Sequence, residues 1–566
     1  MTLTTEATGK KDRLKTALLS LEKALSKPRY RKLSDALVVG FFVVVVLGPV
    51  INIFTTVFSS IGEVRSQVFD DPLTGDYQWR LMVGALARSF QIAALAVAID
   101  FLVGFPMAIL LARFEFRGKR LLDAMVDLPL AVPTSALGLS ISLFWGTRWG
   151  LASLFGLESG FFSPGPSLIL VTHVIFTFPF LTRSLKVVLQ ETPKVYEDAA
   201  STLGAPGFTV FRTITGPLVK EGAIAGTTLA FTRSLGETGA TLMVAGLSET
   251  APIVIVGLRR QLQIPAASFL SLILISVCLF LLFGIKTFSR KVGFPIKKVW
   301  PTGERFLSKP AFRKLRNGFA VIVFFAFVFV PALFIFAYLW RSASDVPSQL
   351  FGPDLKWAHL WTSLVNSILV GGITTFVVLA TGVPMAFIIK NRKWGKFNDV
   401  LDVLVDVPLS IPSAALGFAT FLFWGPSGLQ LFSPGFWMIV WVHVAFTFPY
   451  VIRPVISVVE KSNPGLEDAS RTLGASNLTT FRKVTFPVIK AGVLAGAIMS
   501  FARSLGETGA TIVVMGDVRT IPVLIVDWVE SRQMAAAAFA SACVILFSFL
   551  LLVALRRISN PRRLGT

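Results

Sequence analysis

Two matching segments of the sequence carry charged side chains inside apolar stretches, FTRSLGETGAT at 231–241 and FARSLGETGAT at 501–511. Their functional groups occupy equivalent positions: Arg233, Glu237 and Thr241 in the first segment, and Arg503, Glu507 and Thr511 in the second. Residues four apart share one face of a helix, and charges at membrane depth usually face a helix-bundle interior or an aqueous cavity. Each pair therefore either neutralises itself and locks neighbouring helices, or lines a pathway or gate.

The longest polar excursions of the chain also occur twice, as EDAASTLGAPGFTVFRTITGPLVKEG at 197–222 and EDASRTLGASNLTTFRKVTFPVIKAG at 467–492. Acidic residues suit the first turn of a helix, and glycine permits backbone conformations that other residues resist. Each excursion predicts a short amphipathic helix, a turn at Gly204 or Gly474, and a second short helix leading into the next apolar stretch. A single copy of this pattern is also typical of an ordinary interfacial helix.

A third repeated block reads DLPLAVP at 127–133 and DVPLSIP at 406–412. Two prolines four apart interrupt helical hydrogen bonding within an apolar stretch. Broken backbone at membrane depth is tolerated where it is buried in protein or lines a cavity. The prolines are therefore candidates for a gate or for plain kinks: Pro129, Pro133, Pro408 and Pro412. We place Asp127 and Asp406 near the cytoplasmic interface.

The remaining reactive residue types do not predict catalysis. His173 and His443 lie in matching T-H-V and V-H-V contexts without a nearby set of metal ligands, so we expect core hydrogen-bonding groups and no metal site. Cys278 and Cys543 lie in apolar runs and are expected to be small core residues. No G-x-x-x-x-G-K-[ST] loop occurs in the sequence, so this chain is not expected to bind ATP or to be an enzyme.

The elements that must position these motifs are membrane-spanning helices. Hydrophobic residues make up 54% of the 566 residues and charged residues only 15%, where soluble domains carry about a quarter charged residues. Apolar runs of roughly 20 residues, the length that crosses a bilayer as a helix, recur throughout. We expect an all-α polytopic membrane protein with about twelve spans, near 36–58, 86–112, 121–146, 165–188, 221–246, 266–288, 316–340, 362–390, 399–425, 435–457, 491–516 and 535–556.

The net charge of +22 is distributed as in a membrane protein rather than a nucleic-acid binder. Basic residues cluster before the first apolar run, at mid-chain from Lys286 to Arg316, and after the last apolar run. Lys and Arg beside spans mark the cytoplasmic side. We therefore expect contact with lipid and not with nucleic acid, a multi-pass protein of the plasma (inner) membrane, and both termini in the cytoplasm.

The chain is an internal repeat. An ungapped alignment of 173–246 with 443–516 gives 36 identical residues in 74 positions. An even number of spans in each copy puts both halves in the same orientation, with a pathway expected between them. The predicted organisation is a basic cytoplasmic N-terminus at 1–35, a first half at 36–288 with its loop at 189–220, a linker at 289–315, a second half at 316–556 with its loop at 458–490, and a basic tail at 557–566.

The paired cytoplasmic loops resemble the signature of binding-protein-dependent ABC importer permeases. In that family the loop forms a coupling helix that seats in a groove of the ATPase subunit. The resemblance implies that these residues couple to an ATPase: Glu197, Asp198, Ala199 and Gly204 in the first half, and Glu467, Asp468, Ala469 and Gly474 in the second. The family often has alanine where Asp198 and Asp468 occur, which leaves the role of these two carboxylates open.

The segment R-S-L-G-E-T-G-A-T is similar to the fifth-span segment of sulfate, molybdate and tungstate permeases, which typically read G-E-F-G-A-T. Threonine at positions 238 and 508 replaces the usual phenylalanine. The resemblance implies a fused two-half permease for an inorganic oxyanion such as sulfate, thiosulfate, molybdate or tungstate. It implies as partners two copies of an ABC ATPase, which would bind ATP and Mg²⁺, and an extracytoplasmic solute-binding protein.

Other functions remain open on the sequence alone. Permeases for ferric iron are commonly two-half fusions and have a related fifth-span segment, and a permease for thiamine or a phosphonate is a further alternative. An ion-coupled secondary transporter fits two parallel six-helix halves, but it gives no reason for the two cytoplasmic loops.

Overall fold

The computed structural model describes residues 28–70, 75–288, 301–352, 356–392, 394–463 and 465–559. These residues form helices joined by turns and irregular segments, and none of them lies in a strand, which confirms the all-α fold class. Residues 1–27, 289–300 and 560–566, which belong to the expected basic N-terminus, linker and tail, lie outside the described part. The roles expected of those segments stay predictions.

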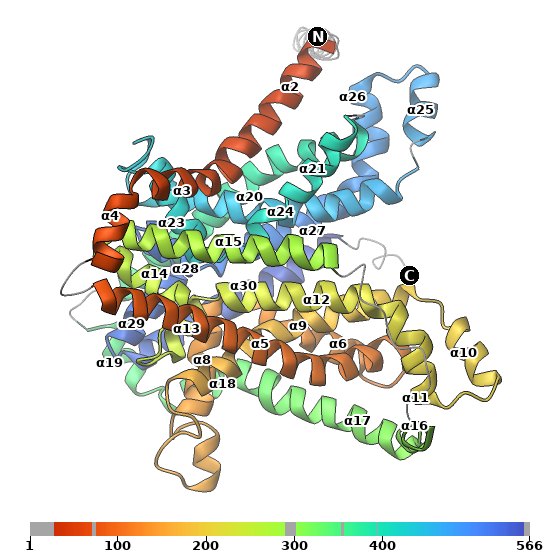
Figure 1. Ribbon diagram of the computed structural model, residues 1–566, viewed down its shortest axis with the longest axis horizontal. Helices are drawn as coiled ribbons and strands as arrows, with labels where there is room; N and C mark the ends of the chain where they lie inside the picture. Colours follow the sequence, from red (N-terminus) through yellow and green to blue (C-terminus); the bar gives the residue numbers. More distant parts are fainter. Residues whose placement is uncertain are drawn as a thin grey trace, which may run out of the picture.

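The first half consists of long apolar helices connected by shorter ones (Figure 1). Its elements are α2 (Pro28–Phe41), the π-helical η1 (Phe42–Leu47), α3 (Gly48–Ser59), α4 (Ile61–Arg65), η2 (Ser66–Asp70), α5 (Gly75–Arg113), α6 (Lys119–Val126), α7 (Leu128–Ala131), α8 (Thr134–Gly146), η3 (Leu151–Phe155), α9 (Pro166–Glu191), α10 (Val195–Thr202), α11 (Gly207–Val210), η4 (Phe211–Thr215), α12 (Gly216–Gly236), α13 (Gly239–Val244), α14 (Ala251–Arg260) and α15 (Ile264–Phe288).

The second half repeats this order almost element for element. Its elements are α16 (Pro301–Leu307), α17 (Pro310–Val323), η6 (Phe324–Phe329), α18 (Val330–Arg341), α19 (Asp345–Leu350), α20 (Lys356–Asn391), α21 (Lys396–Leu404), α22 (Val407–Ser410), α23 (Ser413–Trp424), α24 (Phe436–Lys461), α25 (Gly465–Thr472), α26 (Asn477–Thr480), η7 (Phe481–Thr485), α27 (Phe486–Leu505), α28 (Gly509–Val514), α29 (Ile521–Glu530) and α30 (Met534–Ser559).

Many of these helices are long and apolar enough to cross a membrane. Within the described residues eight helices qualify, or up to ten if each of two bent helix pairs counts as one span. The expected fifth span of the first half is not among these eight helices. The corresponding α12 carries three charged residues, Lys220, Glu221 and Arg233, and ends at a break. The last expected span corresponds to α30, of which Met534–Leu550 is an apolar helix among the described residues. The total of twelve therefore stays a prediction.

The third expected span of each half is a broken helix rather than one continuous rod. In the second half, the pieces before and after Ile411 meet at 108°, and the first half has the same break. Val132 and Ile411 both have an extended backbone with ψ of 132°, and each is followed by proline. The residue before a proline is biased away from the helical region, so the proline blocks redirect the chain at membrane depth.

The first helices of each half cross over to pack on the other half. Phe42 in η1 stacks on Phe448 in α24 with ring centroids 5.4 Å apart, and Phe178 in α9 packs on Phe324 in η6 at 5.6 Å. Ser140 in α8 donates a hydrogen bond to the backbone carbonyl of Pro331 at 2.7 Å. One hydrophobic core therefore runs through both halves and holds them as a single interlocked bundle.

Candidate functional site

The charged motif of each half lies at a break between two helices. α12 ends at Gly236 and α13 begins at Gly239, while α27 ends at Leu505 and α28 begins at Gly509. The first amides of a helix have no intrahelical partner. Oε1 of Glu237 accepts a hydrogen bond from the amide of Ala240 at 3.0 Å, and Glu507 accepts the matching bond from the amide of Ala510 at 3.2 Å. Each glutamate thus caps the helix that follows it.

The two arginine–glutamate pairs differ. Arg503 forms an ion pair with Glu507 at 2.8 Å, and the Glu507 side chain is only 3% exposed. Arg233 forms no ion pair within 4 Å to any described residue, and its guanidinium lies over the rings of Phe176 and Phe180 at 5.2 and 5.8 Å. Aromatic faces attract cations, but less strongly than a carboxylate does. The self-neutralised arrangement is therefore present in the second half only.

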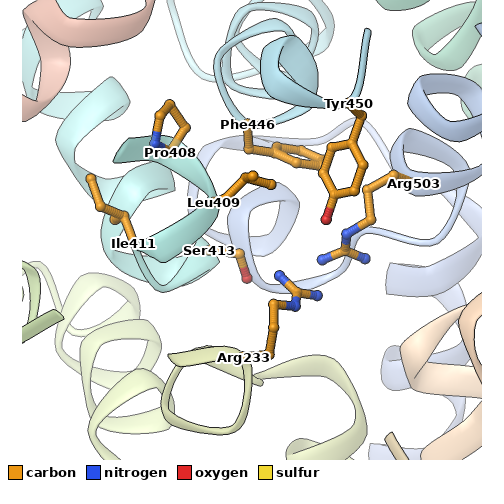
Figure 2. Close-up of a pocket in the computed structure, with 8 residues that line it drawn as sticks. All are labelled: Arg233, Pro408, Leu409, Ile411, Ser413, Phe446, Tyr450 and Arg503. Carbon is orange, nitrogen blue, oxygen red and sulfur yellow. The ribbon is translucent and has the colours of Figure 1, made fainter. Parts of the chain in front are cut away.

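Figure 2 shows the guanidinium groups of Arg233 and Arg503 pointing toward one another from the two halves, with the Tyr450 hydroxyl directed at Arg503. They border a small cavity lined by Arg233, Pro408, Leu409, Ile411, Ser413, Phe446, Tyr450 and Arg503. Its internal volume is about 10 Å³, which is about the space that one water molecule needs. A tetrahedral oxyanion does not fit, so this conformation is closed around the two cations.

The two halves touch through the glycines of the charged motifs. A Cβ added at Gly239 would lie 2.6 Å from Oγ1 of Thr508, and one added at Gly509 would lie 2.7 Å from Oγ1 of Thr238. Real Cβ atoms do not approach this closely, so each position admits only glycine in this conformation. The matched pairs form a pseudo-twofold contact between the two halves, where a pathway between the halves would run.

Two of the four candidate prolines lie at the same contact. The Cα of Pro412 would be 2.9 Å from a Cβ added at Gly236, and the Cα of Pro133 would be 3.1 Å from one added at Gly506. Pro133 and Pro412 therefore pack against the opposite half, and their role as a gate or as plain kinks stays a prediction. Pro129 and Pro408 lie in the short helices α7 and α22 one turn earlier, and Pro408 also lines the central cavity.

Buried histidines organise the charged motif of each half. The ring nitrogens of His173 lie 2.7 Å from Oγ of Ser234 and 2.9 Å from Oγ1 of Thr241, and His443 makes the same contacts with Ser504 and Thr511 at the same distances. Buried polar groups need such partners. The histidines are therefore core hydrogen-bonding groups as expected, and no group of metal-ligating side chains occurs in the described residues.

The two repeated polar loops have the conformation that the sequence predicts. α10 ends at Thr202 and α25 at Thr472, and Gly204 and Gly474 follow with positive φ of 84° and 83°. The chain then enters a second short helix, which continues through a π-helical segment into α12 or α27. Both glycines are needed for conformation, since a left-handed backbone is strained for other residues.

The acidic residues of these loops point in different directions. Oε1 of Glu197 accepts hydrogen bonds from Arg113 at 2.9 Å and from Thr215 at 3.0 Å, and Glu467 accepts one from Thr485 at 2.6 Å. The neighbouring residues of the signature are exposed to solvent: Asp198, Ala199, Asp468 and Ala469. The glutamates therefore hold the loops in shape, and the exposed residues remain available to a partner.

With this geometry established, comparison with known sequences places the chain among transport proteins. The family described as binding-protein-dependent transport system inner membrane component matches residues 104–293 and again residues 379–565, together about two thirds of the chain. The chain belongs to this family. The two matches also show that the inner membrane component occurs here in a fused, two-half form, as the internal repeat predicts.

Curated relatives match this chain over a stretch that covers 38% of its length. The sulfate transport system permease protein CysT of Salmonella typhimurium is 35% identical over 219 residues, which cover 38% of this chain and 78% of the relative. The protein of the same name from Escherichia coli is 33% identical over 222 residues, with the same two shares. The probable sulfate transport system permease protein cysT of Chlorokybus atmophyticus is 33% identical over 227 residues, again with these shares.

The structure shows an exposed leucine in each polar loop that sequence reasoning missed. Leu203 and Leu473, which directly precede the turn glycines, are each 89% exposed. Each loop therefore leaves apolar surface uncovered at the same place. The available signal was that a leucine occurs at the same place in both polar loops.

Sequence reasoning also missed the arginine that fixes each helix break. Arg183 donates hydrogen bonds to Asp127 at 2.6 Å and to Asp123 at 2.5 Å, while Arg453 contacts Asp406 and Asp402 at 2.7 Å. Arg183 lies in α9 and Arg453 in α24. Each arginine binds the short helical segments that precede the proline break. The signal was the repetition of arginine at 183 and 453 and of both aspartates.

We expect Arg183→Lys to destabilise the inner membrane component measurably. A single ammonium group cannot reproduce the bonds that the planar guanidinium makes to both carboxylates, and hydrogen bonds to charged groups contribute about 1.5–3 kcal/mol. The melting temperature of the purified protein in nanodiscs measures the effect. Arg65→Lys is the matched control because its pair with Asp70 is exposed. Equal melting temperatures of the two variants would argue against a structural role of the Arg183 contacts.

Proposed function

We propose that this protein is the permease subunit of an ATP-driven importer for a sulfate-type tetrahedral oxyanion. The observation that carries the proposal is the match to sulfate transport permeases together with two partly buried arginines that face one another between the halves. Oxyanions carry acceptor oxygens that guanidinium groups bind in charge-assisted hydrogen bonds. Opening of the closed cavity would expose Arg233 and Arg503 to a passing anion.

In this proposal the chain supplies the pathway and separate subunits supply the energy. Two copies of an ABC ATPase, which bind ATP and Mg²⁺, dock on the two loops through Leu203, Leu473 and the exposed residues beside them. An extracytoplasmic solute-binding protein delivers the substrate to the opposite side of the membrane. The loops, the linker and both termini then lie in the cytoplasm, as the basic clusters beside the spans indicate.

The substrate assignment is tested on the solute-binding protein that delivers to this permease. We would titrate the purified binding protein by calorimetry with sulfate, thiosulfate, molybdate, tungstate, ferric iron and thiamine. The proposal predicts tight binding of one or more of the tetrahedral oxyanions and no heat from ferric iron or thiamine. Tight binding of ferric iron or of thiamine, without oxyanion binding, would reassign the substrate and leave the arginines as structural groups.

The two arginines are expected to respond differently to mutation. Arg503→Gln should lower the melting temperature because it leaves the buried Glu507 carboxylate unpaired, and breaking a buried pair costs about 3–5 kcal/mol. Arg233→Gln removes a cation that has no ion-pair partner among the described residues, so we expect a near-normal melting temperature and slower uptake. Melting curves and radiolabelled sulfate uptake, measured on both variants, separate these outcomes. Normal uptake by Arg233→Gln would remove this arginine from the pathway.

A further inference from the structure

The loop of the first half at 189–220 and that of the second half at 458–490 are called the first and second coupling loops. A short helix of the linker between the halves is docked on the first coupling loop. Glu304 in α16 is almost fully buried, and its two carboxylate oxygens accept hydrogen bonds from Nε of Arg212 at 3.0 Å and from Oγ1 of Thr209 at 2.5 Å. Oγ of Ser308 accepts a further bond from the backbone amide of Phe208 at 2.8 Å. The segment that leads into the first span of the second half thus holds the coupling loop of the first half.

The sequence of this docked segment occurs a second time, at the start of the chain. Residues 304–315 read ERFLSKPAFRKL and residues 22–33 read EKALSKPRYRKL, with eight of twelve positions identical. The identities include the two residues that make the docking contacts, since Glu304 corresponds to Glu22 and Ser308 to Ser26. The first of these positions is buried in α16 and the second caps the loop, so their repetition is not explained by membrane insertion.

The groups that receive these contacts are repeated as well. In the second coupling loop, Arg482, Thr479 and Leu478 correspond to Arg212, Thr209 and Phe208. Arg482 is exposed and has no ion pair with a described residue, whereas Arg212 is paired with Glu304. The second loop therefore presents the cation that a glutamate buries in the first loop.

The chain can reach this surface because the first helices of the two halves cross over. α17, which follows the docked α16, packs on α5, with Arg313 over the ring of Phe114 at 5.9 Å. α2 occupies the matching place on α20, where Asp35 pairs with Arg392 at 2.7 Å. α2 begins at Pro28, the equivalent of Pro310 at the start of α17, and Figure 1 shows this end on the same side of the molecule as α25 and α26.

We propose that residues 22–27 dock on α26 of the second coupling loop as residues 304–309 dock on α11 of the first. The Glu22 carboxylate forms an ion pair with Arg482 and accepts a hydrogen bond from the hydroxyl of Thr479. Ser26 accepts a hydrogen bond from the amide of Leu478. Each coupling loop is then tied to the first span of the opposite half. Movement of one loop by its ATPase would in this way pull on both halves together. The docking itself does not depend on which substrate is carried.

The contact is tested by disulfide formation in native membranes that contain the whole transporter. In a background with Cys278 and Cys543 replaced by alanine, we would introduce the pair Ser26→Cys and Leu478→Cys. The pair Ser308→Cys and Phe208→Cys is the positive control because a hydrogen bond already joins these positions at 2.8 Å. A protease site placed within 289–300 allows the two halves to be separated after mild oxidation.

We expect the halves of the 26–478 variant to remain joined by a disulfide after cleavage, with a yield close to that of a reporter pair that links the halves elsewhere. For this reference we choose Thr134→Cys with Thr508→Cys, whose hydroxyl oxygens are 3.5 Å apart across the halves. The 208–308 pair also joins the two fragments, and it reports on the contact of α16 with the first coupling loop. Efficient linkage of both controls without any 26–478 disulfide would overturn the proposal and leave the surface at Arg482 to the ATPase subunit.

A charge exchange gives a second, independent measurement. Glu22→Arg and Arg482→Glu should each reduce the ratio of substrate imported to ATP hydrolysed, and the double variant should recover most of this ratio. The matched control set tests the ion pair that the structure shows in the first half. It consists of Glu304→Arg, Arg212→Glu and their combination. Equal defects in the single and double variants at 22 and 482, with rescue at 304 and 212, would contradict the proposed pairing.

Discussion

Replacement of Gly204 and Gly474 by valine is expected to uncouple ATP hydrolysis from uptake. Both glycines have a left-handed backbone, with φ of 84° and 83°, and a β-branched residue in that region is strained by about 1–2 kcal/mol. A Cβ at either position meets no atom of the chain within 4 Å. The strain therefore acts on the turn and not on the core, and it changes the angle between α10 and α11, or between α25 and α26.

The measurement compares ATPase activity and substrate uptake of the assembled transporter in proteoliposomes. We expect membrane insertion to stay intact, ATP hydrolysis to continue and uptake to be largely lost. Gly207→Asn is the matched control because it lies in the same loop, meets no atom within 4 Å, and corresponds to Asn477 in the second half. Normal uptake in the double valine variant would show that these turns do not carry the coupling.

Addition of a methyl group at both central glycines is expected to prevent the two halves from closing. In Gly239→Ala the new Cβ would lie 2.7 Å from Cβ of Thr508, and in Gly509→Ala it would lie 2.7 Å from Cβ of Thr238. A threonine Cβ is fixed to the backbone and cannot rotate away. The contact must open, and overpacked contacts cost about 1–3 kcal/mol, so the closed conformation becomes much less populated.

The readout is the escape of sulfate from loaded proteoliposomes in the absence of ATP. We expect a passive leak in the double alanine variant and uptake reduced about tenfold, since each 1.4 kcal/mol is about a factor of ten in population. Gly84→Ala with Gly372→Ala is the control because these helical glycines face open space. Tight vesicles with unchanged uptake would mean that this contact does not seal the pathway.

The features best predicted from sequence are those that repeat. The identity between 173–246 and 443–516 predicts two equivalent halves, and the family matches at 104–293 and 379–565 confirm them. The loop conformation also followed from local chemistry, because a glycine between two short polar helices has few other roles. Gly204 and Gly474 have the expected turn geometry.

The features missed depend on contacts between distant segments or on geometry that hydropathy does not encode. Arg183 bonds to aspartates 56 and 60 positions away, which no local pattern indicates. The contact of Gly239 with Thr508 joins equivalent motifs of opposite halves and requires knowledge of the symmetry axis. The two charged motifs are nearly identical in sequence, yet only Arg503 pairs with its glutamate. Spacing alone places both groups on one helical face, but in both halves the helix ends before the glutamate, so the spacing does not decide which pair forms.

The most direct test of the account is transport by the purified, reconstituted complex. Proteoliposomes would contain this permease with its ATPase subunit, together with the substrate-loaded binding protein on the side opposite to ATP. The account predicts accumulation of a radiolabelled tetrahedral oxyanion that requires ATP, the ATPase subunit and the binding protein. Accumulation by the permease alone, driven by a proton or sodium gradient and unaffected by ATP, would contradict it and identify an ion-coupled secondary transporter.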